Sequence, residues 1–234
     1  MVLTGEEWEV LRLSIRVAAF SVLLSLPVAV AAAYVLARMR FPGKTLLDAL
    51  IHLPLVLPPV VIGYFLLLVL GRRGPLGAFL DQYFGVVFAF RWTGAAVASA
   101  VMGFPLMVRA IQLSLDAIDE KLEGAAMTLG AGRLRVFATI SLPLALPGLV
   151  TGTLLGFARS LGEFGATITF VSNIPGETRT LPLAIYTYTQ VPNGDLQALR
   201  LSAIAVAVSL VSLLGSEILA RRATAVSKGH DAPR

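Results

Sequence analysis

The sequence of 234 residues contains no cysteine, which excludes a disulfide framework and a metal site with thiolate ligands. Charged side chains are also few, at 14% of the residues, whereas they make up about a quarter of a soluble globular domain. Hydrophobic residues account for 56% of the chain, and the mean hydropathy is +0.81. This composition indicates an integral membrane protein.

Motifs for nucleotide and peptide hydrolysis are absent as well. The chain has no Gly-x-x-x-x-Gly-Lys-Ser/Thr phosphate loop, so we expect no ATPase site and no enzyme activity of that kind. It also has neither His-Glu-x-x-His nor Gly-x-Ser-x-Gly, which argues against an intramembrane hydrolase. Glu6 and Glu7 stand near the N-terminus in place of the positive region of a secretory signal, so we expect the first apolar helix to be retained.

Apolar stretches follow one another along the chain with short gaps and no dividing linker. A spanning helix needs about 20 mostly apolar residues, and an open sheet would leave its backbone unpaired in hydrocarbon. We therefore expect an all-α integral membrane protein, folded as a single helical bundle. The predicted spans cover residues 10–36, 47–70, 92–113, 136–158 and 199–219.

The net charge of +5 is compatible with a nucleic-acid-binding protein or with a membrane protein that has basic cytoplasmic loops. The distribution favours the second, because basic residues collect at alternate ends of the predicted spans and the more basic side faces the cytoplasm. This places the N-terminus outside and the basic tail, 221–234, inside. Eleven of the 19 basic residues lie on the cytoplasmic side: Arg38, Arg40, Lys44, Arg109, Lys121, Arg133, Arg135, Arg221, Arg222, Lys228 and Arg234.

Prolines and glycines mark positions where the predicted spans depart from simple helices. Prolines within or beside the spans indicate either tolerated bends or a role in gating. Gly148, Gly152 and Gly156 in the fourth span form two overlapping small-xxx-small steps, which allow another helix to approach closely. That helix belongs either to the same chain or to a second copy. The prolines are Pro27, Pro54, Pro58, Pro59, Pro105, Pro143 and Pro147.

Residues 119–131, between the third and fourth spans, predict a short amphipathic helix that ends at Gly130. Its charges cluster at the start, and its apolar positions follow helical spacing. The segment is not strongly basic, which favours docking into a protein groove over lipid anchoring, with a plain interfacial connector as the alternative. The apolar positions are Leu122, Ala125, Ala126 and Leu129.

This segment and the start of the fourth span resemble the "EAA" motif of type I ATP-binding-cassette import permeases. Counted back from Gly130, the glutamate of the motif falls on Gly124, and the nearest acid is Glu123, one place earlier. The resemblance implies that the helix couples the permease to a separate ATPase subunit. The residues that it assigns to coupling are Glu123, Gly124, Ala125, Ala126, Gly130, Ile140, Leu142 and Pro143.

The runs 160–182 and 37–44 resemble the molybdate branch of these permeases, with tungstate and sulfate permeases as close relatives. The resemblance implies a permease domain over residues 8–220 in the bacterial inner membrane, acting by alternating access. It also implies a homodimer, two ATPase subunits that use the ATP, and an extracytoplasmic oxyanion-binding protein. No cofactor is expected on this chain, and no nucleic-acid partner. A proton- or sodium-coupled carrier is the rival, but internal repeats and many intramembrane ionisable groups are not evident.

A dianion that crosses hydrocarbon needs hydroxyl and amide donors in place of water. Hydroxyls in membrane helices also bond their own backbone, so each candidate has two interpretations. Glu163 lies four residues after Arg159, which favours a structural ion pair, because a carboxylate would repel a dianion. The candidates for the translocation path are Ser160, Glu163, Thr167, Thr169, Ser172 and Asn173.

Five of the six path candidates lie in a segment, 160–172, that is too short for an ordinary span, and Asn173 follows it directly. It either extends the fourth helix or re-enters the membrane. We expect a turn at 173–180 and a loop at 191–195, where proline and glycine recur. We assign no function to His52.

Overall fold

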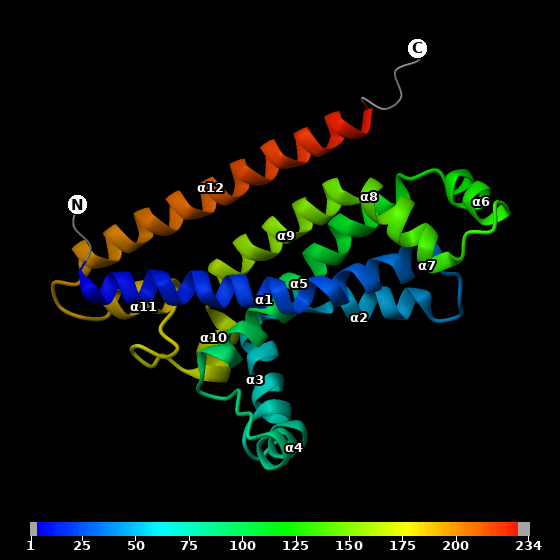
Figure 1. Cartoon of the computed structure of the whole chain (residues 1–234). Coiled ribbons are helices and arrows are strands. Elements are labelled where there is room, and N and C mark those ends of the chain that lie inside the picture. Colours follow the sequence, from blue (N-terminus) through cyan, green and yellow to red (C-terminus); the bar gives the residue numbers. More distant parts are fainter. Residues whose placement is uncertain (1–3, 229–234) are drawn as a thin grey trace.

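The computed structural model describes residues 4–228, and this part of the chain folds into helices joined by turns, with no strand (Figure 1). The predicted all-α class is therefore confirmed. The helices are α1 (Gly5–Arg38), α2 (Lys44–Val56), α3 (Pro59–Leu70), α4 (Pro75–Phe84), α5 (Trp92–Asp116), α6 (Glu120–Thr128), α7 (Arg133–Val136), the π-helical η1 (Phe137–Ser141), α8 (Leu142–Leu144), α9 (Leu146–Leu161), α10 (Gly165–Val171), α11 (Leu181–Thr189) and α12 (Asp195–Lys228).

Helices α1, α5 and α9 pack together and form the centre of the bundle. The close approach predicted at the three glycines of α9 is confirmed, and the partner is α5 of the same chain. A methyl group at Gly152 would lie 3.0 Å from the Met107 carbonyl oxygen, and one at Gly156 would lie 2.6 Å from the Met107 sulfur. Only residues without a side chain leave room for α5 at this distance.

Two of the five predicted spans, 47–70 and 136–158, consist of helices that meet at a sharp bend, and both contain prolines at which a bend was expected. Helices α2 and α3 meet at 112°, and the segment from α7 to α8 meets α9 at 70°. The first break falls at Leu57 and Pro58, which precede prolines and adopt extended backbone angles because the next pyrrolidine ring disfavours the helical ones. By contrast, α1 and α5 continue through Pro27 and Pro105.

Three helices of the described chain are long and apolar enough to cross a membrane, and the number rises to five if each bent pair counts as one span. The long helices are α1, α5 and the 195–215 part of α12. Helix α12 is longer than the predicted span 199–219, since its backbone stays helical into the basic tail as far as Lys228. The rest of the predicted tail, 229–234, lies outside the described residues.

The sequence left two alternatives for residues 160–172, and one of them, an extension of the fourth helix, is wrong. Helix α9 ends at Leu161, and α10 follows as a separate helix of 7 residues, too short to cross a bilayer. Helix α10 packs beside α3, where Gly63 leaves no space for a side chain against the Ala166 backbone. The turns predicted at 173–180 and 191–195 are confirmed, whereas α4 and α11 were not predicted.

Candidate functional site

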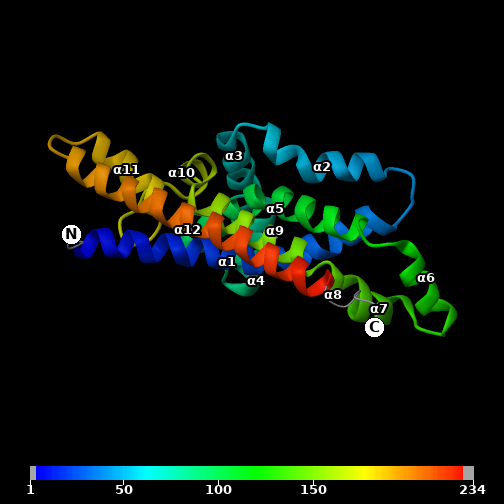
Figure 2. The ribbon, with the colours of Figure 1, turned by 90° about the horizontal axis from the view of Figure 1, so that it is seen from above.

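Helix α6 lies at one end of the bundle, and the start of α1 and α11 lie at the other (Figures 1 and 2). The predicted helix within 119–131 is confirmed. Asp119 caps its start by accepting a hydrogen bond from the Lys121 amide at 2.9 Å. At its end, Gly130 has a φ of +90°, a left-handed conformation that favours glycine and stops the helix.

The side chains of α6 show the reverse of the usual burial pattern, because an acidic side chain is buried and apolar side chains are exposed. Glu123 is only 8% exposed, whereas Leu122 is 52%, Met127 45% and Leu129 89% exposed. Leu134 in α7 adds a further exposed apolar side chain close in sequence. No described part of the chain covers this apolar face, and exposed apolar clusters of this kind mark interaction surfaces.

Glu123 is buried because it anchors α6 to the bundle. Its carboxylate accepts hydrogen bonds from Arg38 Nε, at 3.0 and 3.1 Å, and from Ser141 Oγ at 2.8 Å. The guanidinium of Arg38 also donates to the carbonyl oxygens of Leu115, at 2.8 Å, and of Ile118, at 3.3 Å. One ion pair therefore connects α6 with the end of α1, the end of α5 and the π-helical η1.

This arrangement explains the spacing of the motif. Ser141 lies between Ile140 and Leu142 in the second part of the motif. The number of residues between this part and α6 allows the Ser141 hydroxyl to donate a hydrogen bond to Glu123. The shift of the acid by one place puts Glu123 on the buried side of α6. A side chain at Gly124, by contrast, would meet nothing within 4 Å.

Of the other residues assigned to coupling, Ala125 is exposed and Ala126 is partly exposed on α6. The sequence interpretation overlooked Arg38 and Ser141 as members of this site. Arg38 lies in the run 37–44, and Ser141 lies inside the motif. Their positions in these two resembling segments were the only sequence features that could have indicated a role at this site.

Several hydroxyls of the predicted translocation path are used inside the chain. Thr167 donates to the Phe164 carbonyl at 2.8 Å, and Thr169 donates to the Gly165 carbonyl at 2.9 Å, so the interpretation that they bond their own backbone is confirmed. Ser160 is buried and accepts a hydrogen bond from Ser21 Oγ at 2.8 Å, which joins α9 to α1.

The predicted ion pair of Glu163 is confirmed. Arg159 Nη1 lies 2.6 Å from Glu163 Oε2, and the Ala166 amide donates to Glu163 Oε1 at 2.7 Å, so the buried carboxylate links the end of α9 to the start of α10. Ser172 has a φ of +64° where the chain leaves α10, and Asn173 bonds Arg179 and Thr187. These contacts hold the turn after α10, whereas Ser160, Glu163 and Thr167 are buried inside the described chain.

Three further observations concern titratable groups. Within residues 4–228, no group of three histidine or acidic side chains is placed to hold a metal ion. His52 contacts its own helix, with Nδ1 2.9 Å from the Asp48 carbonyl oxygen. Burial, followed by the negative charge of Glu6, raises the pKa of Tyr188, which lies in α11 near the start of α1.

A bundle of helices, three of which are long and apolar enough to cross a membrane, and up to five if each bent pair counts as one, defines the described chain as a multi-pass membrane protein. The chain belongs to the family of binding-protein-dependent transport system inner membrane components, whose profile matches residues 25–225. It is accordingly a multi-pass protein of the inner membrane. Its fold is that of the transmembrane domain of a type I importer.

Curated relatives and solved structures agree with this assignment. The chain is 61% identical over 221 residues to the molybdenum transport system permease protein ModB of Escherichia coli K12, covering 94% of this chain and 96% of the relative. It is 59% identical over 216 residues to the protein of the same name from Haemophilus influenzae, covering 92% and 94%. A bacterial ABC transporter that imports alginate has the same fold, with a TM-score of 0.74 at 17% identity over 94% of this chain and 80% of that one.

Proposed function

We propose that the chain is the permease subunit of an ATP-driven importer and carries molybdate across the inner membrane by alternating access. The family and the two relatives named as molybdenum permeases support the transported anion. The observation that supports energy coupling is the exposed apolar face of α6, held in position by the buried Glu123.

The partners follow from this role. ATP is hydrolysed by a separate subunit that receives the apolar face of α6, while this chain binds no cofactor. Two copies of the chain enclose the path, and an extracytoplasmic binding protein delivers the anion to the end of the bundle opposite α6. The N-terminus then lies outside and α6 in the cytoplasm, as the distribution of basic residues predicts.

The contacts of Glu123 supply a mechanism for coupling. When the ATPase pair closes and moves α6, the Arg38 ion pair carries the motion to α1 and α5, and the Ser141 hydrogen bond carries it to η1. Helix η1 leads into the 70° bend before α9, so the motion reaches the packed α5 and α9 pair. Different affinities of the partners for the inward-open and outward-open states then shift the population between them.

An ion-coupled carrier fits the structure less well. Such a carrier needs an acid that takes up and releases a proton or holds a cation within the membrane. The buried acids of the described chain are each paired with an arginine instead: Glu7 with Arg200 at 2.8 Å, Glu123 with Arg38, and Glu163 with Arg159.

The test is ATP hydrolysis by the complex reconstituted with its ATPase and binding protein, with molybdate, tungstate, sulfate and phosphate compared. We expect loaded binding protein to stimulate hydrolysis with molybdate above all. In Leu129→Asp, assembly and stimulation should both be lost, because a charge enters the docking face. Leu196→Asp is the control for ATPase assembly, since Leu196 is also an exposed leucine but lies at the start of α12, at the other end of the bundle. Hydrolysis that ignores every oxyanion, or an equal loss of ATPase assembly in both variants, would contradict the proposal.

A further inference from the structure

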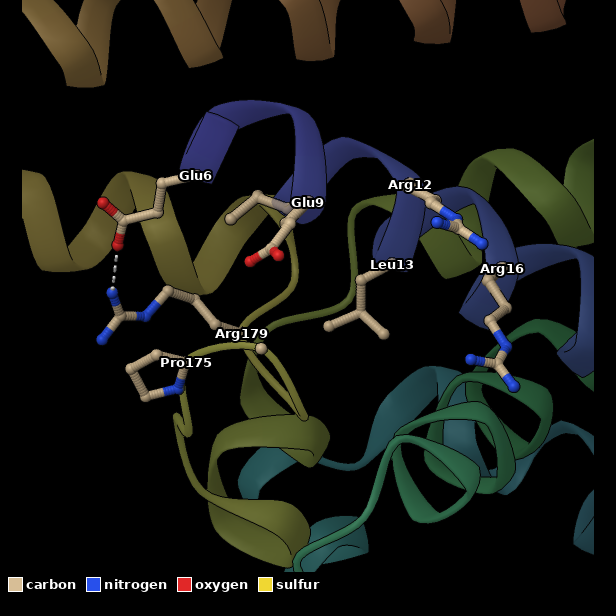
Figure 3. Close-up of a pocket in the computed structure, with 9 residues that line it drawn as sticks. Glu6, Glu9, Arg12, Leu13, Arg16, Pro175 and Arg179 are labelled. Carbon is tan, nitrogen blue, oxygen red and sulfur yellow. Dashed lines mark hydrogen bonds and ion pairs between the residues drawn. The ribbon is translucent and has the colours of Figure 1, made fainter. Parts of the chain in front are cut away.

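A pocket of about 490 Å³ opens at the end of the bundle opposite α6, and the coupling mechanism does not use it (Figure 3). The first turns of α1 form one wall, and the turn that contains Pro175 and Arg179 forms the other. Three arginines and two glutamates contribute to the lining, which gives the five charged groups a net charge of +1: Arg12, Arg16, Arg179, Glu6 and Glu9.

The charges are separated within the pocket. Arg179 Nη1 lies 3.3 Å from Glu6 Oε1, and Glu9 lies on the same side, whereas Arg12 and Arg16 lie on the other side, one after the other along α1 (Figure 3). Within the described chain, no carboxylate forms an ion pair with either Arg12 or Arg16. The positive charge of the pocket is therefore concentrated at these two arginines.

The two arginines are four residues apart, so they occupy the same face of α1, where two like charges repel each other. They also fall within the apolar stretch 10–36, and charged side chains in such a stretch face water-filled cavities or bind charged partners. An anion between the two guanidinium groups would remove the repulsion. Each guanidinium presents a planar fork of N–H donors, which matches the oxygen atoms of an oxyanion.

Arg16 is held in place by an aromatic side chain. Its Cζ lies 3.7 Å from the centroid of the Trp92 ring, a cation–π contact, and Phe20 packs edge-on against the same ring at 5.4 Å. This contact uses one face of the guanidinium and leaves its N–H edge free to donate hydrogen bonds. A small part of the site is thus oriented before any ligand binds.

We propose that Arg12 and Arg16 form a binding site for a tetrahedral oxyanion at the outer mouth of the permease, where the anion rests after delivery and before translocation. The inference rests on the proposed function, which supplies the anion at this end of the bundle. Trp92 positions Arg16, and the Glu6–Arg179 pair closes the far side of the pocket without adding free negative charge near the anion.

Trp92 provides a direct binding assay. The chain has 2 tryptophans, so the full-length Trp8→Phe variant in lipid vesicles has Trp92 as its single intrinsic tryptophan, in contact with Arg16. We expect a saturable fluorescence change on addition of sodium molybdate, absent with sodium chloride at equal ionic strength. Arg12→Gln should raise the half-saturating concentration roughly tenfold, since one set of charge-assisted hydrogen bonds is lost. Arg72→Gln is the matched control, because Arg72 is exposed and lies away from the pocket.

Two results would overturn the site: no saturable change with molybdate, or equal half-saturating concentrations in Arg12→Gln and Arg72→Gln. This titration uses neither the ATPase nor the binding protein. Failure of the site and failure of the permease assignment are therefore separate results.

Uptake by the reconstituted complex distinguishes an anion site from a socket for an acidic side chain of the binding protein. For an anion site, Arg12→Gln lowers the maximal rate of molybdate uptake severalfold and leaves the half-saturating concentration of loaded binding protein unchanged. A raised half-saturating concentration with an unchanged maximal rate would show that the pocket receives the binding protein, and the proposed anion site would be wrong.

Discussion

The ion pair between Arg38 and Glu123 allows a quantitative test of how α6 is held. Both side chains are buried, and removing one partner of a buried pair leaves an uncompensated charge that costs about 3–5 kcal/mol. Arg38 keeps two backbone carbonyl acceptors when Glu123 is removed, so we place Glu123→Leu near the lower value, at about 3 kcal/mol. Arg38→Met leaves the carboxylate with only Ser141 as a donor and should cost at least as much.

The double variant Arg38→Met/Glu123→Leu removes both charges at once. Replacing a buried ion pair by apolar side chains of similar volume is often close to neutral, so its destabilisation should be smaller than the sum of the single effects by about 3 kcal/mol or more. The measurement is the free energy of unfolding in detergent for the four proteins of this cycle. Glu120→Gln on the same helix, at an exposed position, is the control and should stay within about 0.5 kcal/mol of the parent.

Coupling should respond differently from assembly in the same variants. The apolar face of α6 is unchanged in Glu123→Leu, so the ATPase still binds, but the number of molybdate ions transported per ATP hydrolysed should fall because α6 moves without α1. Additive effects on stability, or a Glu123→Leu complex with unchanged stability and an unchanged transport ratio, would refute the view that this pair anchors α6.

Three further predictions concern other parts of the fold. Gly148→Ala should destabilise the protein by about 1–3 kcal/mol through overpacking, since the added carbon would lie 2.6 Å from the Ala110 carbonyl oxygen. Gly124→Ala is the control and should be neutral or slightly stabilising, because its added carbon would meet nothing within 4 Å. Thermal unfolding of the two variants checks both expectations. Glu163→Gln should lower stability by about 1.5–3 kcal/mol through loss of the Arg159 pair, without a change in which oxyanion is transported; a changed anion preference at full stability would instead make Glu163 part of the path. The pKa of Tyr188 is raised above 10.0 in the folded protein, so the folded state holds this proton more tightly and loses stability as the pH rises above that value. Tyr188→Phe should therefore lose less stability than the parent in alkaline unfolding curves. Identical curves for the two proteins would contradict the raised pKa of Tyr188.

Composition and local spacing were sufficient to predict the features that depend on neighbours in sequence. The low charge and the long apolar runs predicted a membrane bundle, because a chain cannot satisfy its backbone in lipid except by helices or a closed barrel. Helix α6 and its end at Gly130 followed from local periodicity and from the backbone freedom of glycine. The Arg159–Glu163 pair followed from the geometry of one helical turn.

Tertiary structure decided the features that join distant segments. Glu123 meets Arg38 across 85 positions of sequence, and Ser160 meets Ser21 across 139, so no periodicity within one helix predicts these contacts. The prolines marked where the helices could bend, but not which of them bend. The chain turns by 112° at Pro58, where α3 packs against α10, whereas α1 continues through Pro27 and α5 through Pro105. The glycines of α9 indicated a close neighbour, and only the arrangement of the helices in space showed that this neighbour is α5, because the side chains that a glycine accommodates belong to another part of the chain.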